Sequence, residues 1–71
     1  MNSIKINDEY IRLDQALKLS GIAGTGGHAK NIILDGDVAV NGEVCLMRGK
    51  KLRRGDKINA YGEQFMITND G

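Results

Sequence analysis

The most concentrated chemistry in this 71-residue chain is the positive charge between residues 48 and 57. Six basic residues stand there against one acid, Asp56, which gives the segment a net charge of +5. The whole chain carries only +1, so the remainder carries −4. The basic residues are Arg48, Lys50, Lys51, Arg53, Arg54 and Lys57. Charge segregated in this way favours a binding site for a polyanion over a general aid to solubility.

The glycines and aromatic residues indicate which kind of polyanion the segment would bind. Gly49 and Gly55 interrupt the basic segment and allow the backbone to approach a polyanion closely. The three aromatic residues, Tyr10, Tyr61 and Phe65, include no closely spaced pair, which disfavours a stacking platform for single strands. We therefore expect recognition of the phosphates and shape of a structured RNA. The alternatives are an adaptor whose basic face meets an acidic protein, duplex DNA binding, and a merely solvated surface.

A second candidate site is the glycine-rich stretch from Gly24 to Gly27, ahead of a predicted helix. Unpaired amides and the helix dipole at such a position favour a phosphate. The stretch lacks the lysine of a P-loop and follows a helix instead of a strand, which argues against nucleotide hydrolysis. The alternative is a flexible loop between helices.

Catalytic and metal chemistry find little support. His28 and Cys45 are the only residues of their kinds, so no internal disulfide or multi-cysteine metal site can form. Asp56 and Glu63 lie beside glycine turns, where carboxylates commonly serve turn geometry. A short chain also encloses a deep pocket poorly. We expect a protein that is not an enzyme, with no cofactor, metal or small-molecule substrate.

The stretch from Thr25 to Gly36 predicts a short helix that would position the glycine-rich stretch. Thr25 is a good N-cap, because its hydroxyl can accept from a first-turn amide. Ala29, Ile32 and Ile33 follow at the spacing of one apolar helix face. Gly36 would end the helix, since glycine adopts the left-handed conformation without a side-chain clash.

The next stretch predicts a hairpin. Val38 and Val40 alternate as in a strand, and Asn41-Gly42 is a strong two-residue turn pattern. With that turn Val40 faces Glu43, and a returning strand runs to Leu46. We favour Val38, Val40 and Cys45 on the buried face. Ala39, Val44 and Leu46 form a competing face.

The flanking elements complete an α+β prediction. A first helix runs from Ile11 to Ser20, with Leu13, Ala16 and Leu17 inward and Asp14 facing elsewhere. Short strands are expected at 3–6, 57–60 and 65–67, with residues 69–71 frayed. The whole is one domain, 1–71: two helices as an antiparallel pair, packed on a small, twisted, mostly antiparallel sheet. The polar N-terminus and the absence of a long apolar run indicate a soluble, cytoplasmic protein that contacts no membrane. We also expect a monomer.

The order of these motifs resembles the RNA-binding domain named after ribosomal small-subunit protein S4. The resemblance covers roughly residues 10–58, followed by a hairpin at 57–68. It is closest to small free-standing bacterial members. The residues that carry it are Arg12-Leu13-Asp14, Leu17, Gly21, Thr25, Ala29, Gly36, Val38, Val40-Asn41-Gly42 and Gly55-Asp56-Lys57-Ile58. The resemblance implies the alpha-L motif and binding to structured RNA, ribosomal RNA or the ribosome.

The resemblance also implies which residues touch RNA. Many relatives have Ser-Arg at the start of the second helix, where this chain has Thr25-Gly26. Because of this difference, RNA contacts are expected mainly from Lys30 and from the segment from Arg48 to Arg54. His28 and Lys30 lie about 200° apart around a helix, so both need not touch RNA. The implied RNA-binding residues are Arg12, Thr25, Gly26, Gly27, His28, Lys30, Arg48, Lys50, Lys51, Arg53 and Arg54.

Overall fold

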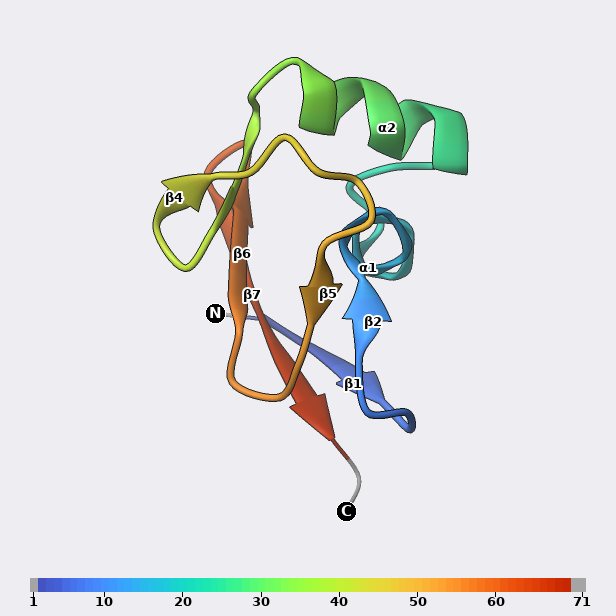
Figure 1. The fold of residues 1–71 in the computed structure, drawn as a ribbon, viewed down its shortest axis with the longest axis vertical. Helices are drawn as coiled ribbons and strands as arrows, with labels where there is room; N and C mark the ends of the chain where they lie inside the picture. Colours follow the sequence, from blue (N-terminus) through green and yellow to red (C-terminus); the bar gives the residue numbers. More distant parts are fainter. Residues whose placement is uncertain (1, 70–71) are drawn as a thin grey trace.

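Two helices and a two-stranded ribbon pack against a five-stranded sheet in the computed structural model, which describes residues 2–69 (Figure 1). The elements are β1 (Asn2–Ile6), β2 (Ile11–Arg12), α1 (Leu13–Ser20), α2 (Gly26–Leu34), β3 (Val38–Val40), β4 (Glu43–Val44), β5 (Lys51–Leu52), β6 (Lys57–Ala60) and β7 (Glu63–Asn69). The α+β class is therefore confirmed. The expected fraying at the C-terminus concerns Asn69, which lies in β7, and residues 70–71, which lie outside the described residues.

The sheet has the order β1-β7-β6-β3-β4. All its neighbouring strands are antiparallel except β1 and β7, which run parallel with Ile4 opposite Ile67. The edge strand expected at residues 3–6 is thus present, and its partner comes from the other end of the chain. The mostly antiparallel sheet is confirmed, with one parallel pair that no local pattern indicates.

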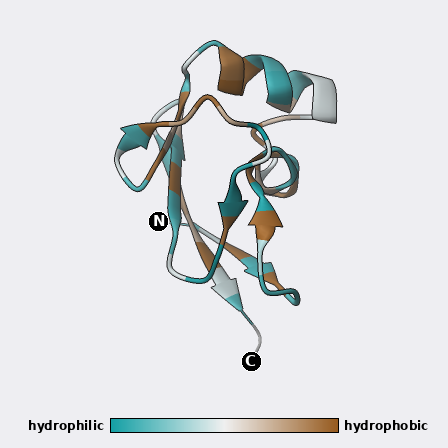
Figure 2. Ribbon diagram, in the orientation of Figure 1, coloured by the Kyte–Doolittle hydropathy of each residue, from teal (hydrophilic) through white to brown (hydrophobic). Residues whose placement is uncertain are grey.

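The hydrophobic core contains residues from both helices, from the five-stranded sheet and from the ribbon. Hydrophilic and hydrophobic residues alternate along the strands (Figure 2), so one side of each strand turns inward. The buried apolar residues are Ile4, Ile6, Leu13, Ala16, Leu17, Ala23, Ala29, Ile32, Ile33, Val38, Val40, Leu52, Ile58, Ala60, Phe65 and Ile67. This core holds the helices and both sheets as one unit.

Helix α1 begins two residues later than predicted. Leu13 is its first residue, whereas Ile11 and Arg12 form β2. The helix ends at Ser20, and the next residue, Gly21, has a left-handed φ of 84°. Figure 1 shows α1 almost end-on while α2 runs across the view, so the two packed helices cross instead of lying alongside one another.

Helix α2 forms as its sequence predicts. The Thr25 hydroxyl accepts from the His28 amide at 3.0 Å. Beyond the helix, Gly36 has a φ of 83°, and its amide donates to the Ile33 carbonyl at 3.1 Å. The Asp37 amide donates to the Ile32 carbonyl at 3.1 Å, which completes a Schellman ending.

The β3–β4 hairpin turns at Asn41 and Gly42, with φ values of 51° and 89°, as a type I′ turn requires. Val40 lies opposite Glu43, as predicted. The returning strand is shorter than predicted, because β4 ends at Val44 and Cys45 follows it, with its amide on the Val38 carbonyl at 3.0 Å. The favoured face is confirmed: Val38 and Val40 are buried and Cys45 packs against the core.

We expect Gly42→Val to destabilise the fold by about 1 kcal/mol or more, because a β-branched residue is strained at positive φ. The added Cβ would meet no atom within 4 Å, so the cost would come from the backbone alone. Gly49→Val is the matched control, since Gly49 has open space and no positive φ. Urea denaturation of both variants measures the difference, and equal midpoints would contradict the turn assignment.

Candidate nucleic-acid interface

Strands β2 and β5 form a short antiparallel ribbon that carries basic side chains. Ile11 pairs with Leu52, and Arg12 pairs with Lys51. Leu52 is fully buried and Ile11 packs against the core. Because successive residues of a strand point to opposite faces, Arg12 and Lys51 lie on the outer face of the ribbon.

Tyr10 extends this outer face by one residue. It immediately precedes β2, so the register places it opposite Arg53. The Lys51 ammonium lies 4.9 Å from the centre of the Tyr10 ring, and the Arg53 guanidinium carbon lies 5.8 Å from it. Both distances suit cation–π contacts. Sequence reasoning missed Tyr10, because its partners become visible only once β2 and β5 are known to pair.

The loop before β5 is fixed to the first turn of α1. The Leu13 amide donates to the Lys50 carbonyl at 2.8 Å, and the Asp14 amide donates to the Arg48 carbonyl at 3.1 Å. The first amides of a helix lack partners within the helix, and Arg12, the N-cap residue, provides no side-chain cap. The backbone that carries Arg48 and Lys50 therefore serves as the cap and lies next to Arg12.

Asp14 corrects a prediction, because it was expected to face away from the core but is only 7% exposed. Its carboxylate accepts from Arg12 Nη2 at 3.0 Å and from the Gln15 amide at 2.8 Å. The pair orients the Arg12 guanidinium, whose side chain remains 48% exposed. A guanidinium has five N–H donors, so donors remain for a phosphate.

Asp56, the acid within the basic segment, has a structural role. Its carboxylate accepts from the Arg53 amide at 2.8 Å and from Asn41 Nδ2 at 3.1 Å. Asn41 Oδ1 in turn accepts from the Lys57 amide at 3.0 Å. These bonds connect the turn after β5 to the turn of the β3–β4 hairpin, as expected for a carboxylate beside a glycine turn.

We call the cluster of residues on and beside the ribbon the ribbon site; it comprises Tyr10, Arg12, Arg48, Lys50, Lys51 and Arg53. Two stretches of chain, residues 10–12 and residues 48–53, contribute to it, and strand pairing and backbone hydrogen bonds hold them together. Arg54 lies beyond it, in the turn closed by Gly55. Five of the basic residues that the sequence indicated are thereby brought together.

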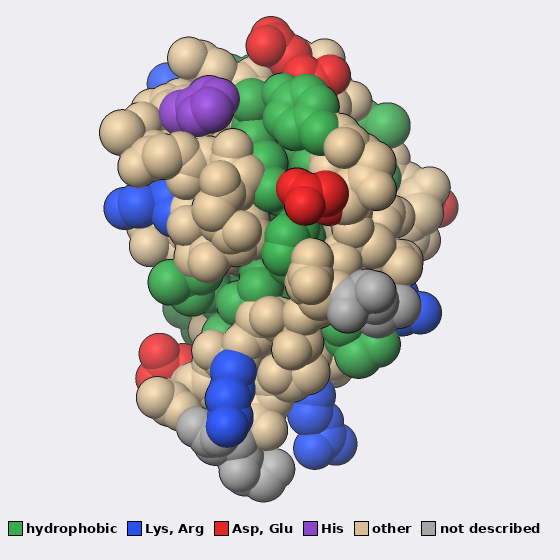
Figure 3. Space-filling view, turned by 180° about the vertical axis from the view of Figure 1, so that it is seen from behind, with side chains coloured by type: hydrophobic (Ala, Val, Ile, Leu, Met, Phe, Trp, Pro, Cys, Tyr) green, Lys and Arg blue, Asp and Glu red, His purple; other side chains and the backbone are tan. Residues whose placement is uncertain are grey.

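The residues expected at the start of α2 form a separate group. Thr25 caps the helix, and Gly26 and Gly27 form its first turn. His28 Nδ1 accepts from the Gly24 amide at 3.4 Å, so its contact is local. Lys30 is exposed. In the view from behind, the histidine is on the visible face, where Lys and Arg side chains are scattered instead of gathered (Figure 3).

Two other features, a metal site and a membrane-spanning helix, have no candidate among residues 2–69. Within residues 2–69, no three His, Cys, Asp or Glu side chains gather in a way that would hold a metal ion. None of the helices in that range is long and apolar enough to cross a membrane.

The fold and these motifs define an S4 domain, and the chain belongs to that family: the family model matches residues 4–68. The match extends beyond the 10–58 of the resemblance and reaches into β1 and β7, the first and last strands. The chain is 39% identical over 69 residues to the probable ribosome maturation protein RlbA of Bacillus subtilis (strain 168). That alignment covers 96% of this chain and 97% of the relative.

A solved relative supports the same fold. The solution structure of YbcJ from E. coli superimposes with a TM-score of 0.73 at 26% identity, covering 96% of this chain and 87% of YbcJ. That structure is described as revealing an AlfaL motif involved in RNA-binding. The predicted S4-like architecture is thus confirmed.

Proposed function

We propose that this chain is a non-catalytic RNA-binding protein that engages structured ribosomal RNA through the ribbon site. The observation that carries the proposal is the grouping of five basic residues from two stretches of chain at the ribbon, with two of them, Lys51 and Arg53, over the Tyr10 ring. Basic residues gathered on one surface bind phosphates and release condensed counterions, and such contacts do not depend on base sequence. The S4 family and the ribosome maturation name of RlbA support the choice of RNA over an acidic protein.

A second, weaker contact would come from the start of α2. Thr25, Gly26 and Gly27 present first-turn amides, which favour a phosphate. Lys30 is the preferred side chain there, with His28 on another side of the helix. Arg54 would add a contact at the far end of the ribbon. The protein would act in the cytoplasm as a monomer and need no cofactor.

Crosslinking in cells tests the proposal directly. Ultraviolet crosslinking of the tagged protein would be followed by sequencing of attached RNA and mass spectrometry of attached proteins. We expect ribosomal RNA from the wild type and little from a variant with Arg12, Lys51 and Arg53 changed to alanine. Recovery of a protein partner without RNA would instead favour the hypothesis of an adaptor whose basic face meets an acidic protein.

We expect Tyr10→Leu to weaken RNA binding several-fold, because Lys51 and Arg53 would lose the ring that orders them. Exposed cation–π contacts contribute about 0.5–1 kcal/mol each. Tyr10→Phe should retain binding, since the ring remains. Tyr61→Leu is the control: Tyr61 is also exposed, but its hydroxyl bonds Asp37 at 3.0 Å in another part of the fold. Fluorescence anisotropy with a labelled RNA hairpin measures all three, and equal affinity of Tyr10→Leu and wild type would remove Tyr10 from the site.

A further inference from the structure

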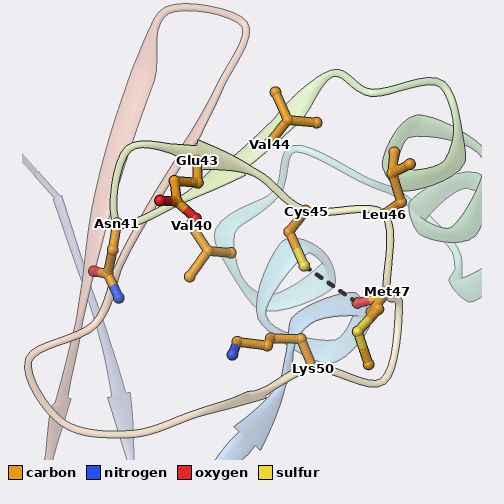
Figure 4. A pocket seen from close by; sticks show the side chains of 8 residues that line it. All are labelled: Val40, Asn41, Glu43, Val44, Cys45, Leu46, Met47 and Lys50. Carbon is orange, nitrogen blue, oxygen red and sulfur yellow. Dashed lines mark hydrogen bonds between the residues drawn. The ribbon is translucent and has the colours of Figure 1, made fainter.

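A hollow of about 450 Å³ lies between the β3–β4 hairpin and the loop that leads to Lys50. Figure 4 shows Val40, Cys45 and Met47 around it, with the Lys50 side chain reaching from the loop toward the hairpin. Val44 and Leu46 also border the hollow, but their side chains point away from it. The volume falls within the roughly 300–1,000 Å³ range of small-molecule sites.

The hollow has a preformed frame. On one side, the Asn41–Gly42 turn is held by the bonds of Asn41 to Asp56 and to the Lys57 amide. On the other side, the Lys50 amide donates to the Met47 carbonyl at 3.1 Å, and the Cys45 thiol contacts the same carbonyl at 3.8 Å. A ligand would therefore find most of the walls in place, which lowers the entropy lost on binding.

The walls combine apolar and polarizable groups with two charges. Methyl groups of Val40, the Cys45 thiol and the Met47 thioether suit the face of a planar ring. Glu43 stands on the hairpin side and Lys50 on the loop side. Both are exposed, and no hydrogen bond or ion pair of either side chain is found within residues 2–69. A carboxylate accepts from N–H groups and an ammonium donates to a carbonyl.

We propose that this hollow receives one unpaired guanine of the RNA that the ribbon site holds. Guanine offers N–H donors at N1 and N2 for Glu43 and the O6 acceptor for Lys50 on one edge. Lys50 belongs to both sites, so a strand whose phosphates lie on the ribbon site passes the hollow. This inference rests on the proposed function and adds a base-specific contact to it. The contact would not need the closely spaced aromatic pair of a stacking platform.

Cys45 is the only cysteine of the chain, so its alkylation by iodoacetamide reports on the hollow. The probes are five RNA hairpins with one stem: fully paired, or with a single bulged G, A, C or U. We expect the bulged-G hairpin to slow alkylation about tenfold at saturation, and the fully paired hairpin to leave the rate unchanged. We also expect bulged G to bind about tenfold more tightly than bulged A, the range that one bidentate base contact supplies.

Variants separate the hollow from the ribbon site. Glu43→Gln should remove the preference for G over A while the paired hairpin binds as before, and Glu63→Gln, another exposed carboxylate, is the control. Cys45→Phe should block the hollow with the same result, whereas Cys45→Val should retain the preference. Equal binding of all five hairpins, with Cys45 equally reactive in each complex, would overturn the guanine site and leave the proposed function standing. Failure of every hairpin to bind would overturn both.

Discussion

Changing Lys50 and Lys51 together to alanine is expected to reduce the salt dependence of RNA binding by about one to two units of slope. Each phosphate contact displaces condensed counterions, so log K falls with log salt by about 0.7 per contact on single strands and 0.9 on duplex. Four to six contacts imply a slope of roughly −3 to −5 for the wild type. Both lysines are exposed, so the fold should remain intact.

The matched control removes the same charge elsewhere. Lys5 lies in β1 and Lys18 in the last turn of α1, both outside the ribbon site. Changing this pair to alanine should lower affinity slightly through net charge and leave the slope near its wild-type value. The measurement is fluorescence anisotropy with one RNA hairpin between 50 and 300 mM salt. A folded Lys50/Lys51 variant with the wild-type slope would remove both residues from the site.

Leu52→Ala is expected to cost roughly 2–5 kcal/mol of the free energy of unfolding, the usual range for a buried leucine. Leu52 is fully buried, although the basic Lys51 and Arg53 stand on either side of it. A chain of this length has only about 4–10 kcal/mol of stability in total. The substitution therefore removes a large part of it and loosens the strand that carries the two cations.

Met47→Ala is the control for that prediction, because Met47 immediately precedes the basic segment but is 66% exposed. It should change stability by about 0.5 kcal/mol or less. Urea denaturation followed by circular dichroism measures both variants. A Leu52→Ala protein as stable as Met47→Ala would show that β5 does not anchor the ribbon to the core.

The sequence by itself determined the elements that depend on neighbouring residues. The cap at Thr25, the apolar face of α2, its glycine ending and the Asn41–Gly42 turn all follow from local geometry. Each needs only three to five consecutive residues, and the structure confirms each. The S4 family was recognisable for the same reason, because its motifs are such local units in a given order.

Only the tertiary structure decided what the basic segment faces. Strands β2 and β5 have two residues each, too few for any alternation to predict them, and their pairing spans some forty residues of chain. That pairing brings Tyr10 to Lys51 and Arg53. Because it also places Ile11 and Arg12 in a strand, the prediction that α1 begins at Ile11 was wrong. Asp14 was misplaced for a different reason: its partners, Arg12 and the Gln15 amide, are close in sequence, but the spacing of apolar residues assigns any charged residue to the solvent side. The parallel pair of β1 and β7 is also a contact between distant parts of the chain, which local propensity does not determine.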